Sequence, residues 1–229
     1  NSKTLNEWRT PNSIALRIQG RGNVFFAYVE YCTQKWRAGA DSPGGFATIK
    51  DDITGRSHLK GFPCGDTAYP WTLRYDPDAN GGNGSITVTL GGETAQCYLT
   101  PGHKMDGATF DHFGLLNIMK SADSGGEAWL PNISVEGKAE DLSKNPQWEG
   151  LGNRTEYPTT DVRPQGDFGY SPTAFAGGNR GELGGLIFRG DCRYPNKMAC
   201  YGDRLSPLTL DKPLLVSGKV SLRRGVSDS

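Results

Sequence analysis

The sequence has no charge imbalance and no long hydrophobic run. Its 229 residues include 25 basic and 25 acidic side chains, so the formal net charge is zero. A chain without excess positive charge does not attract nucleic acid or an anionic membrane surface over long distances. No apolar stretch approaches the roughly 18 residues that a membrane-spanning helix requires. We therefore expect neither a nucleic-acid partner nor a membrane span.

Several common catalytic signatures are also missing. The chain has three histidines and no His-x-x-His or Cys-x-x-Cys spacing, which argues against a zinc site. The Gly-x-Ser-x-Gly pattern of many serine hydrolases does not occur, and no glycine-rich segment has the strand-to-helix context of a nucleotide-binding loop. These absences direct attention to carboxylate, arginine and tyrosine chemistry.

The sequence is rich in turn-forming residues and in segments where apolar and polar residues alternate. It has 32 glycines and 14 prolines, and no segment keeps a 3.6-residue apolar period over three turns. Period-2 alternation instead predicts strands over residues 13–19, 24–31, 46–49, 71–75, 86–90, 93–99, 110–119, 126–136, 182–189 and 215–222. We predict one all-β domain over residues 1–229, built as a two-sheet antiparallel sandwich with little helix. Residues 38–68 are expected to form a long loop, and 138–180 an extended polar linker or sheet-covering segment.

The first two predicted strands form a hairpin around the turn at residues 20–23. Arg17 lies on the first strand and Tyr28 on the second, each on the face opposite the alternating aliphatic residues. Cross-strand neighbours on one face lie roughly 4.5–8 Å apart at Cβ. We therefore expect Arg17 and Tyr28 to lie side by side on an open sheet face.

A second stretch, YPWTLRYDPDANGGNGSITVTLGGETAQCYL at residues 69–99, contains two strands and an acidic, glycine-rich connection. Trp71, Leu73 and Tyr75 share one face, so the alternation predicts that they pack in the core. Arg74 points the other way and is the better candidate for contacting a ligand.

Two segments resemble a known family. WTLRYDPDANGGNGSITVTLGGET resembles the part of concanavalin A-like and laminin G-like sandwiches in which one strand leads to a hairpin that carries a ligand-contacting Trp or Tyr. FDHFGLLNIMKSADSGGEAWLPNISVEG is similar to the strand pair that closes such domains. The resemblance covers about residues 69–137 and implies a jelly-roll sandwich of the kind found in secreted carbohydrate-active proteins. In relatives the closing strand often has Asp-Asp where this chain has Pro131 and Asn132.

Two smaller features suggest ligands or cross-links. Asp76, Asp78 and Asn80 offer hard oxygen donors for calcium, but the twelve-residue calcium loop and its terminal Glu are missing, so an ordinary turn is the other interpretation. Among the five cysteines, Cys192 and Cys200 have the spacing of a small disulfide loop, with two unrelated thiols as the alternative.

Paired carboxylates would indicate glycoside hydrolysis. The single-strand pattern Glu-x-Asp-x-x-Glu of sandwich hydrolases is missing. Pairing of Glu30, Glu127 or Glu182 across strands stays open.

Cations and aromatic side chains make a second constellation. A cation beside a sugar carboxylate lowers the pKa of the adjacent C–H, and a tyrosine can move that proton. The residues assigned to this chemistry are Arg17, Tyr28 and Lys219, with Glu30, Trp36, Arg37, Arg74, Glu182 and Arg189 as further substrate contacts. We therefore expect a secreted or periplasmic protein that binds an anionic polysaccharide; whether it also depolymerises the polymer, as a lyase or hydrolase, stays open. The alternatives are a non-catalytic carbohydrate-binding module and a structural adhesion module, whose outer faces carry ordinary surface charges.

Overall fold

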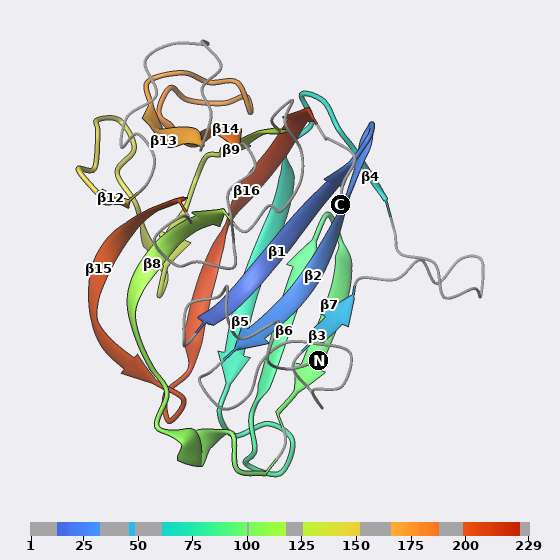
Figure 1. Ribbon diagram of the computed structural model, residues 1–229, viewed down its shortest axis with the longest axis vertical. Coiled ribbons are helices and arrows are strands. Elements are labelled where there is room, and N and C mark those ends of the chain that lie inside the picture. Colours follow the sequence, from blue (N-terminus) through green and yellow to red (C-terminus); the bar gives the residue numbers. More distant parts are fainter. Residues whose placement is uncertain are drawn as a thin grey trace.

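In the computed structural model the chain is an antiparallel all-β structure (Figure 1). The structure describes residues 13–32, 46–48, 61–99, 101–117, 126–151, 166–187 and 199–224. Within these ranges every paired strand is antiparallel, and the one helical element is the 3₁₀ turn η1 (Lys104–Asp106). The predicted fold class is therefore confirmed. No helix in the described part of the chain is long and apolar enough to cross a membrane.

The strands form three sheets. The small sheet contains β1 (Ser13–Arg21), β2 (Val24–Cys32), β3 (Phe46–Thr48) and β4 (Phe62–Pro63). The large sheet has the order β13 (Asp167–Ser171), β14 (Glu182–Ile187), β9 (Gly126–Leu130), β16 (Leu214–Arg224), β5 (Tyr69–Asp76), β6 (Ser85–Leu90) and β7 (Glu93–Tyr98), and β10 (Ser134–Val135) and β11 (Lys138–Ala139) form a hairpin attached to β16. The third sheet contains β12 (Glu149–Leu151), β15 (Ala199–Thr209) and β8 (Thr109–Asn117).

The small and third sheets cover one face of the large sheet. Figure 1 shows the β1–β2 hairpin crossing in front of β5, β6 and β7, with the curved pair β8–β15 beside it. One continuous core joins Val29 of β2, Val88 of β6, Tyr201 of β15 and Val220 of β16, all of them fully buried. We call this core side of the large sheet its inner face, and the opposite side its outer face.

The inner face of β5 follows the alternation in the sequence. Trp71, Leu73 and Tyr75 are each at most 6% exposed, as predicted. The indole of Trp71 lies opposite Gly218 of β16. A Cβ at Gly218 would come within 2.9 Å of Ile133 Cδ1 and 3.2 Å of a Trp71 ring carbon, so glycine makes room there for the large ring.

Two strands, β13 and β15, lie where the sequence did not predict a strand. β13 lies inside the segment 138–180, which was expected to be a linker or covering loop, and it pairs along its whole length with β14. All five residues of β13 are buried: Phe168 and Tyr170 face the core, and Asp167, Gly169 and Ser171 form a second buried face of small and polar residues. β15 was not predicted at all. Its Gly202, Asp203 and Pro207 resemble turn residues, and Pro207 is accommodated at a bulge between Arg204 and Leu208.

Candidate functional site

Arg17 and Tyr28 form a direct cross-strand pair in the small sheet. The register places Arg17 of β1 opposite Tyr28 of β2, and the guanidinium carbon lies 5.7 Å from the centre of the phenol ring. This distance is within the range of cation–π attraction. The adjacent rung, Leu16 opposite Val29, faces the core. The two residues therefore lie side by side, as the sequence indicates, while their contact with a ligand stays a prediction.

Tyr28 is more buried than the expected open face would allow. Its exposed fraction is 9%, whereas Arg17 keeps an intermediate exposure. Tyr28 lies in the central strand of the small sheet, opposite Arg17 of β1 and Thr48 of β3. Arg17 is consequently the member of the pair that a ligand reaches first.

Lys219 and Arg74 lie on a different sheet from this pair. Lys219 is in β16 opposite Pro70, and Arg74 is in β5 opposite Leu215. The expectation that Lys219 would lie on a strand next to Arg17 and Tyr28 is therefore wrong. The β1–β2 hairpin and β16 lie far apart in the sequence, so local sequence patterns do not indicate whether they belong to the same sheet. Both cations are instead exposed on the outer face of the large sheet.

Several predicted residues cannot be placed. Trp36, Arg37, Arg189 and Cys192 lie outside the described residues. The backbone of Glu30 pairs with Ala15 and Phe46, but its side chain is not described. Cys200 lies in β15 between Leu116 and Leu151. The Cys192–Cys200 disulfide thus stays a prediction.

The acidic turn after β5 uses its side chains to shape the backbone. Asp76 accepts hydrogen bonds from Arg74 Nη2 at 3.0 Å and from the Asp78 backbone N–H at 3.1 Å. Asn80, which has a positive φ of 55°, donates its side-chain amide to Leu99 O at 2.8 Å. No group of three or more His, Cys, Asp or Glu side chains among the described residues is arranged to hold a metal ion. These contacts account for the Asp and Asn residues as turn formers, and calcium binding stays a prediction.

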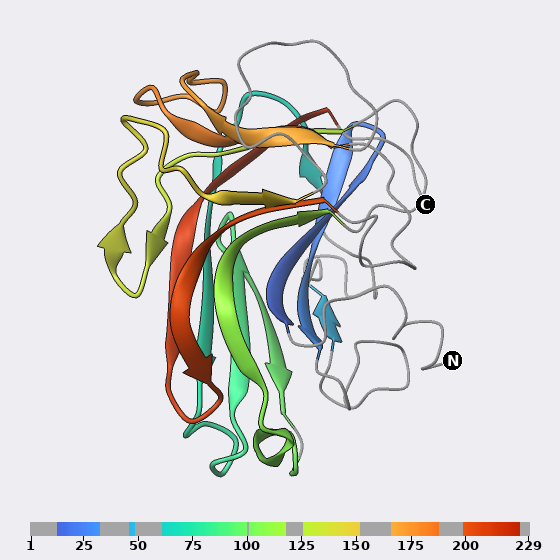
Figure 2. The same cartoon turned by 60° about the vertical axis from the view of Figure 1, so that its left-hand side comes forward.

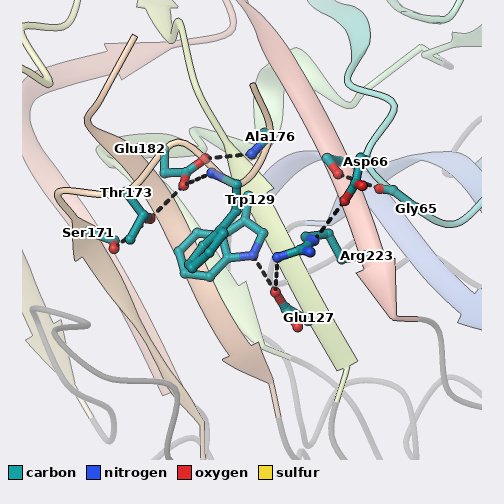
Figure 3. A network of polar contacts seen from close by, with 11 residues as sticks. Gly65, Asp66, Glu127, Trp129, Ser171, Thr173, Ala176, Glu182 and Arg223 are labelled. Atoms are coloured by element: carbon teal, nitrogen blue, oxygen red, sulfur yellow. Dashed lines mark hydrogen bonds and ion pairs between the residues drawn. The ribbon is translucent and has the colours of Figure 1, made fainter. Parts of the chain in front are cut away.

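Glu182 is a buried structural anchor (Figure 3). Its exposed fraction is 0%. Oε1 accepts hydrogen bonds from Thr173 Oγ1 and the Phe175 backbone N–H, both at 2.6 Å, and Oε2 accepts one from the Ala176 backbone N–H at 3.0 Å. Both carboxylate oxygens are therefore occupied by the chain itself. The expectation that Glu182 contacts substrate is corrected, because a ligand has no access to it.

A second polar group lies beside this anchor, and we call it the Arg223 cluster: Asp66, Glu127, Trp129, Phe175 and Arg223. Arg223 Nε donates to Asp66 at 3.0 Å, its Nη1 lies 3.5 Å from Glu127 Oε1, and its Cζ lies 5.0 Å from the centre of the Phe175 ring. Trp129 Nε1 donates to Glu127 at 2.7 Å. Glu127 and Glu182 therefore accept hydrogen bonds from different donor groups.

The Arg223 cluster was not found from the sequence. Asp66 and Arg223 are 157 residues apart, and neither belongs to a recognisable motif. The cluster and the Glu182 anchor together hold two loops against the outer face of β9 and β14. There Trp129, Ala176 and Leu186 form a small apolar core of their own, with Ala68 and Phe175 packed against it.

A third polar group lies on the outer side of β8, β12 and β15. His112 Nδ1 is 2.7 Å from Asp111 Oδ1, and its Nε2 is 3.8 Å from Glu149 Oε2. Arg204 Nε lies 3.4 Å from the other oxygen of Glu149. The hydrogen bond with His112 lowers the pKa of Asp111. All four side chains are 44–69% exposed, so this group is a solvated ion-pair network.

Comparison with known proteins finds no relative of this chain. No protein family, no curated protein and no solved structure matches the chain.

Proposed function

We propose that this chain is a carbohydrate-binding β-sandwich domain that takes an acidic sugar at Arg17. The single observation that carries the proposal is the rung in which Arg17 faces Tyr28 at 5.7 Å. Arg17 stands on the face of the small sheet that is turned away from the core. The class of ligand follows from the chemistry of this pair.

The guanidinium is suited to a sugar carboxylate or sulfate. It is planar and presents paired N–H donors that match two oxygens of an acidic group, which an ammonium cannot do. Contact with the Tyr28 ring restricts the rotamers of Arg17, so less conformational entropy is lost when the anion binds. The proposed role of Tyr28 is to position Arg17 for this contact.

Binding is favoured over depolymerisation. A β-eliminating tyrosine must come within hydrogen-bond reach of a sugar C–H, and Tyr28 is only 9% exposed. The second cation assigned to that chemistry, Lys219, lies in β16 of the large sheet. The proposal therefore names a binding module, which was the alternative to a lyase or hydrolase.

The test is affinity electrophoresis of the native protein in gels that contain polygalacturonate. We expect retardation of the wild-type protein that weakens as salt is added, because the contact is ionic. Arg17→Ala should lose most of the retardation, and Arg17→Lys should recover only part of it. Arg204→Ala is the matched control, since Arg204 is also a strand arginine but is exposed on the third sheet.

Two results would reject the proposal. Equal retardation of Arg17→Ala and the wild-type protein would remove Arg17 from the site. Release of unsaturated uronate from polygalacturonate by the wild-type protein would show that the module is catalytic.

A further inference from the structure

The outer face of the large sheet is divided into a covered part and an open part. Over β9 and β14 it is covered by the loops that the Arg223 cluster and Glu182 hold in place, with Trp129, Ala176 and Leu186 beneath them. Over β16, β5, β6 and β7 the outward side chains are exposed or half-buried, except Ser85 and Ser221, which are 2% and 0% exposed. In the side view of Figure 2, the β10–β11 hairpin projects beside β16.

One rung of the open part consists entirely of hydroxyl side chains. The registers of four strand pairs align one residue from each of five strands, and we call these five the hydroxyl row: Ser134 (β10), Ser217 (β16), Thr72 (β5), Thr89 (β6) and Thr94 (β7). Thr72 Oγ1 and Thr89 Oγ1 are 2.7 Å apart and share a hydrogen bond. Neighbouring strands in a sheet are about 4.8 Å apart, so the row repeats at about that interval across the strands.

The rungs beside the hydroxyl row are mixed. On the side away from the acidic turn, the outward residues Lys219 and Pro70 lie opposite each other and are both exposed. The next rung towards the acidic turn contains Leu215, Arg74, Thr87 and Gln96. Its one charged side chain, Arg74, is paired with Asp76 at 3.0 Å. Tyr98 donates to Gln96 Oε1 at 2.8 Å, so the amide is held in place at the β7 edge. Across this part of the face, hydroxyl and amide groups outnumber unpaired charges.

This chemistry selects one kind of occupant. A protein partner would need an apolar centre to the interface, and a nucleic acid would need several unpaired cations for its phosphates. Hydroxyl and amide groups both donate and accept, as the hydroxyls of an uncharged sugar do, so each can be satisfied by a polyhydroxylated chain. The interval of the row is close to the advance per ring in an extended, β-linked polysaccharide.

We propose that the hydroxyl row is a second glycan-binding surface, on which an uncharged, extended β-linked polysaccharide lies across the strands from β10 to β7. β7 ends the described sheet, so a long chain can continue past this edge. The surface is separate from Arg17, which lies in the small sheet. The inference therefore does not depend on the acidic-sugar site.

The test is affinity electrophoresis and calorimetry of the full chain with hydroxyethylcellulose, a soluble neutral β-linked polymer. We expect the wild-type protein to bind it. The double variant T72V/T89V removes two hydroxyls and keeps the side-chain shape, and it should lower the affinity about tenfold or more. T72S/T89S keeps both hydroxyls and should stay close to the wild-type protein. Ser206→Ala, which removes an exposed hydroxyl on β15, is the matched control.

The outcomes separate the two sites. Loss of hydroxyethylcellulose binding in T72V/T89V with unchanged polygalacturonate binding supports the second surface. If the double variant does not fold, Thr94→Val at the exposed edge replaces it and should weaken binding about threefold or more. The proposal is overturned if the wild-type protein does not bind hydroxyethylcellulose, or if the valine variants bind as tightly as the serine variants.

Discussion

Arg17 and Tyr28 face each other across β1 and β2, with the guanidinium carbon 5.7 Å from the ring centre. If the ring positions the cation, the aromatic face is the part of Tyr28 that affects binding. Tyr28→Phe should then keep the affinity for polygalacturonate, whereas Tyr28→Leu should lower it about threefold, in line with a cation–π contact of about 0.5–1 kcal/mol.

The phenylalanine variant also separates positioning from proton transfer. A catalytic tyrosine would lose its activity on removal of the hydroxyl, while a positioning residue would not. Thermal unfolding of both variants should accompany the titration, because Tyr28 is nearly buried. A large loss of affinity in Tyr28→Phe, without unfolding, would contradict the positioning role.

Glu182 is predicted to be critical for stability. Replacing it with Ala would leave the Thr173 hydroxyl and the backbone N–H groups of Phe175 and Ala176 without their acceptor. We expect a loss of about 3 kcal/mol in the free energy of unfolding, measured by urea denaturation. Glu149→Ala removes an exposed carboxylate and should cost less than about 1 kcal/mol. Similar losses in both variants would contradict the anchoring role.

Gly184 is predicted to tolerate no side chain. Its φ is +146°, and a Cβ there would lie 2.0 Å from Ala128 O in the neighbouring strand. Gly184→Ala should therefore destabilise the fold by about 3 kcal/mol or more, because backbone rather than a flexible side chain must move. Gly92→Ala is the control, since Gly92 also has positive φ but its Cβ would meet nothing within 4 Å. Its cost should be limited to about 1–2 kcal/mol of backbone strain.

The stability should fall at alkaline pH. Burial raises the pKa of the Cys97 thiol from 9.0 to about 12. Burial, helped by Asp211, Asp76 and Asp78, raises the pKa of Tyr75 from 10.0 to about 12. In this range the folded chain holds protons that the unfolded chain releases, so the stability is complete below pH 9 and is lost as pH rises towards 12.

Urea midpoints at neutral pH and at about pH 10.5 would measure this loss. Cys97→Ala should lower the stability at neutral pH but reduce its further decline at high pH, because one of the two buried acids is gone. A wild-type midpoint that does not change between the two pH values would contradict the assignment of both groups as buried and protonated.

The sequence predicts β5 and misses β13 and β15, where residues that also favour turns obscure the strand. The alternation of Trp71, Leu73 and Tyr75 identifies β5 because the side chains on its other face are exposed or half-buried. β13 is only five residues long, contains Gly169 and lies between Gly166 and Pro172, so its short alternation does not stand out from a turn-rich segment. The adjacency of Arg17 and Tyr28 follows from one short turn, whereas the pairing of β2 with β3 and the burial of Tyr28 are not encoded in local patterns.

The candidate sites show the same limit. The role of Glu182 depends on the backbone N–H groups of residues 175 and 176. Every residue except proline has such a group, so the identities of these two residues give no sign of the contact. The hydroxyl row depends on the registers of four strand pairs, and a shift of one residue in any of them would disperse it. Such arrangements become visible only in three dimensions.

The most direct test of glycan binding is an array of acidic and neutral polysaccharides probed with the wild-type protein at low and high salt. The account predicts salt-sensitive binding to uronate-rich polymers, from the contact with Arg17, and salt-insensitive binding to neutral β-linked polymers, from the hydroxyl row. Failure of the folded protein to bind any polysaccharide on the array would contradict the account.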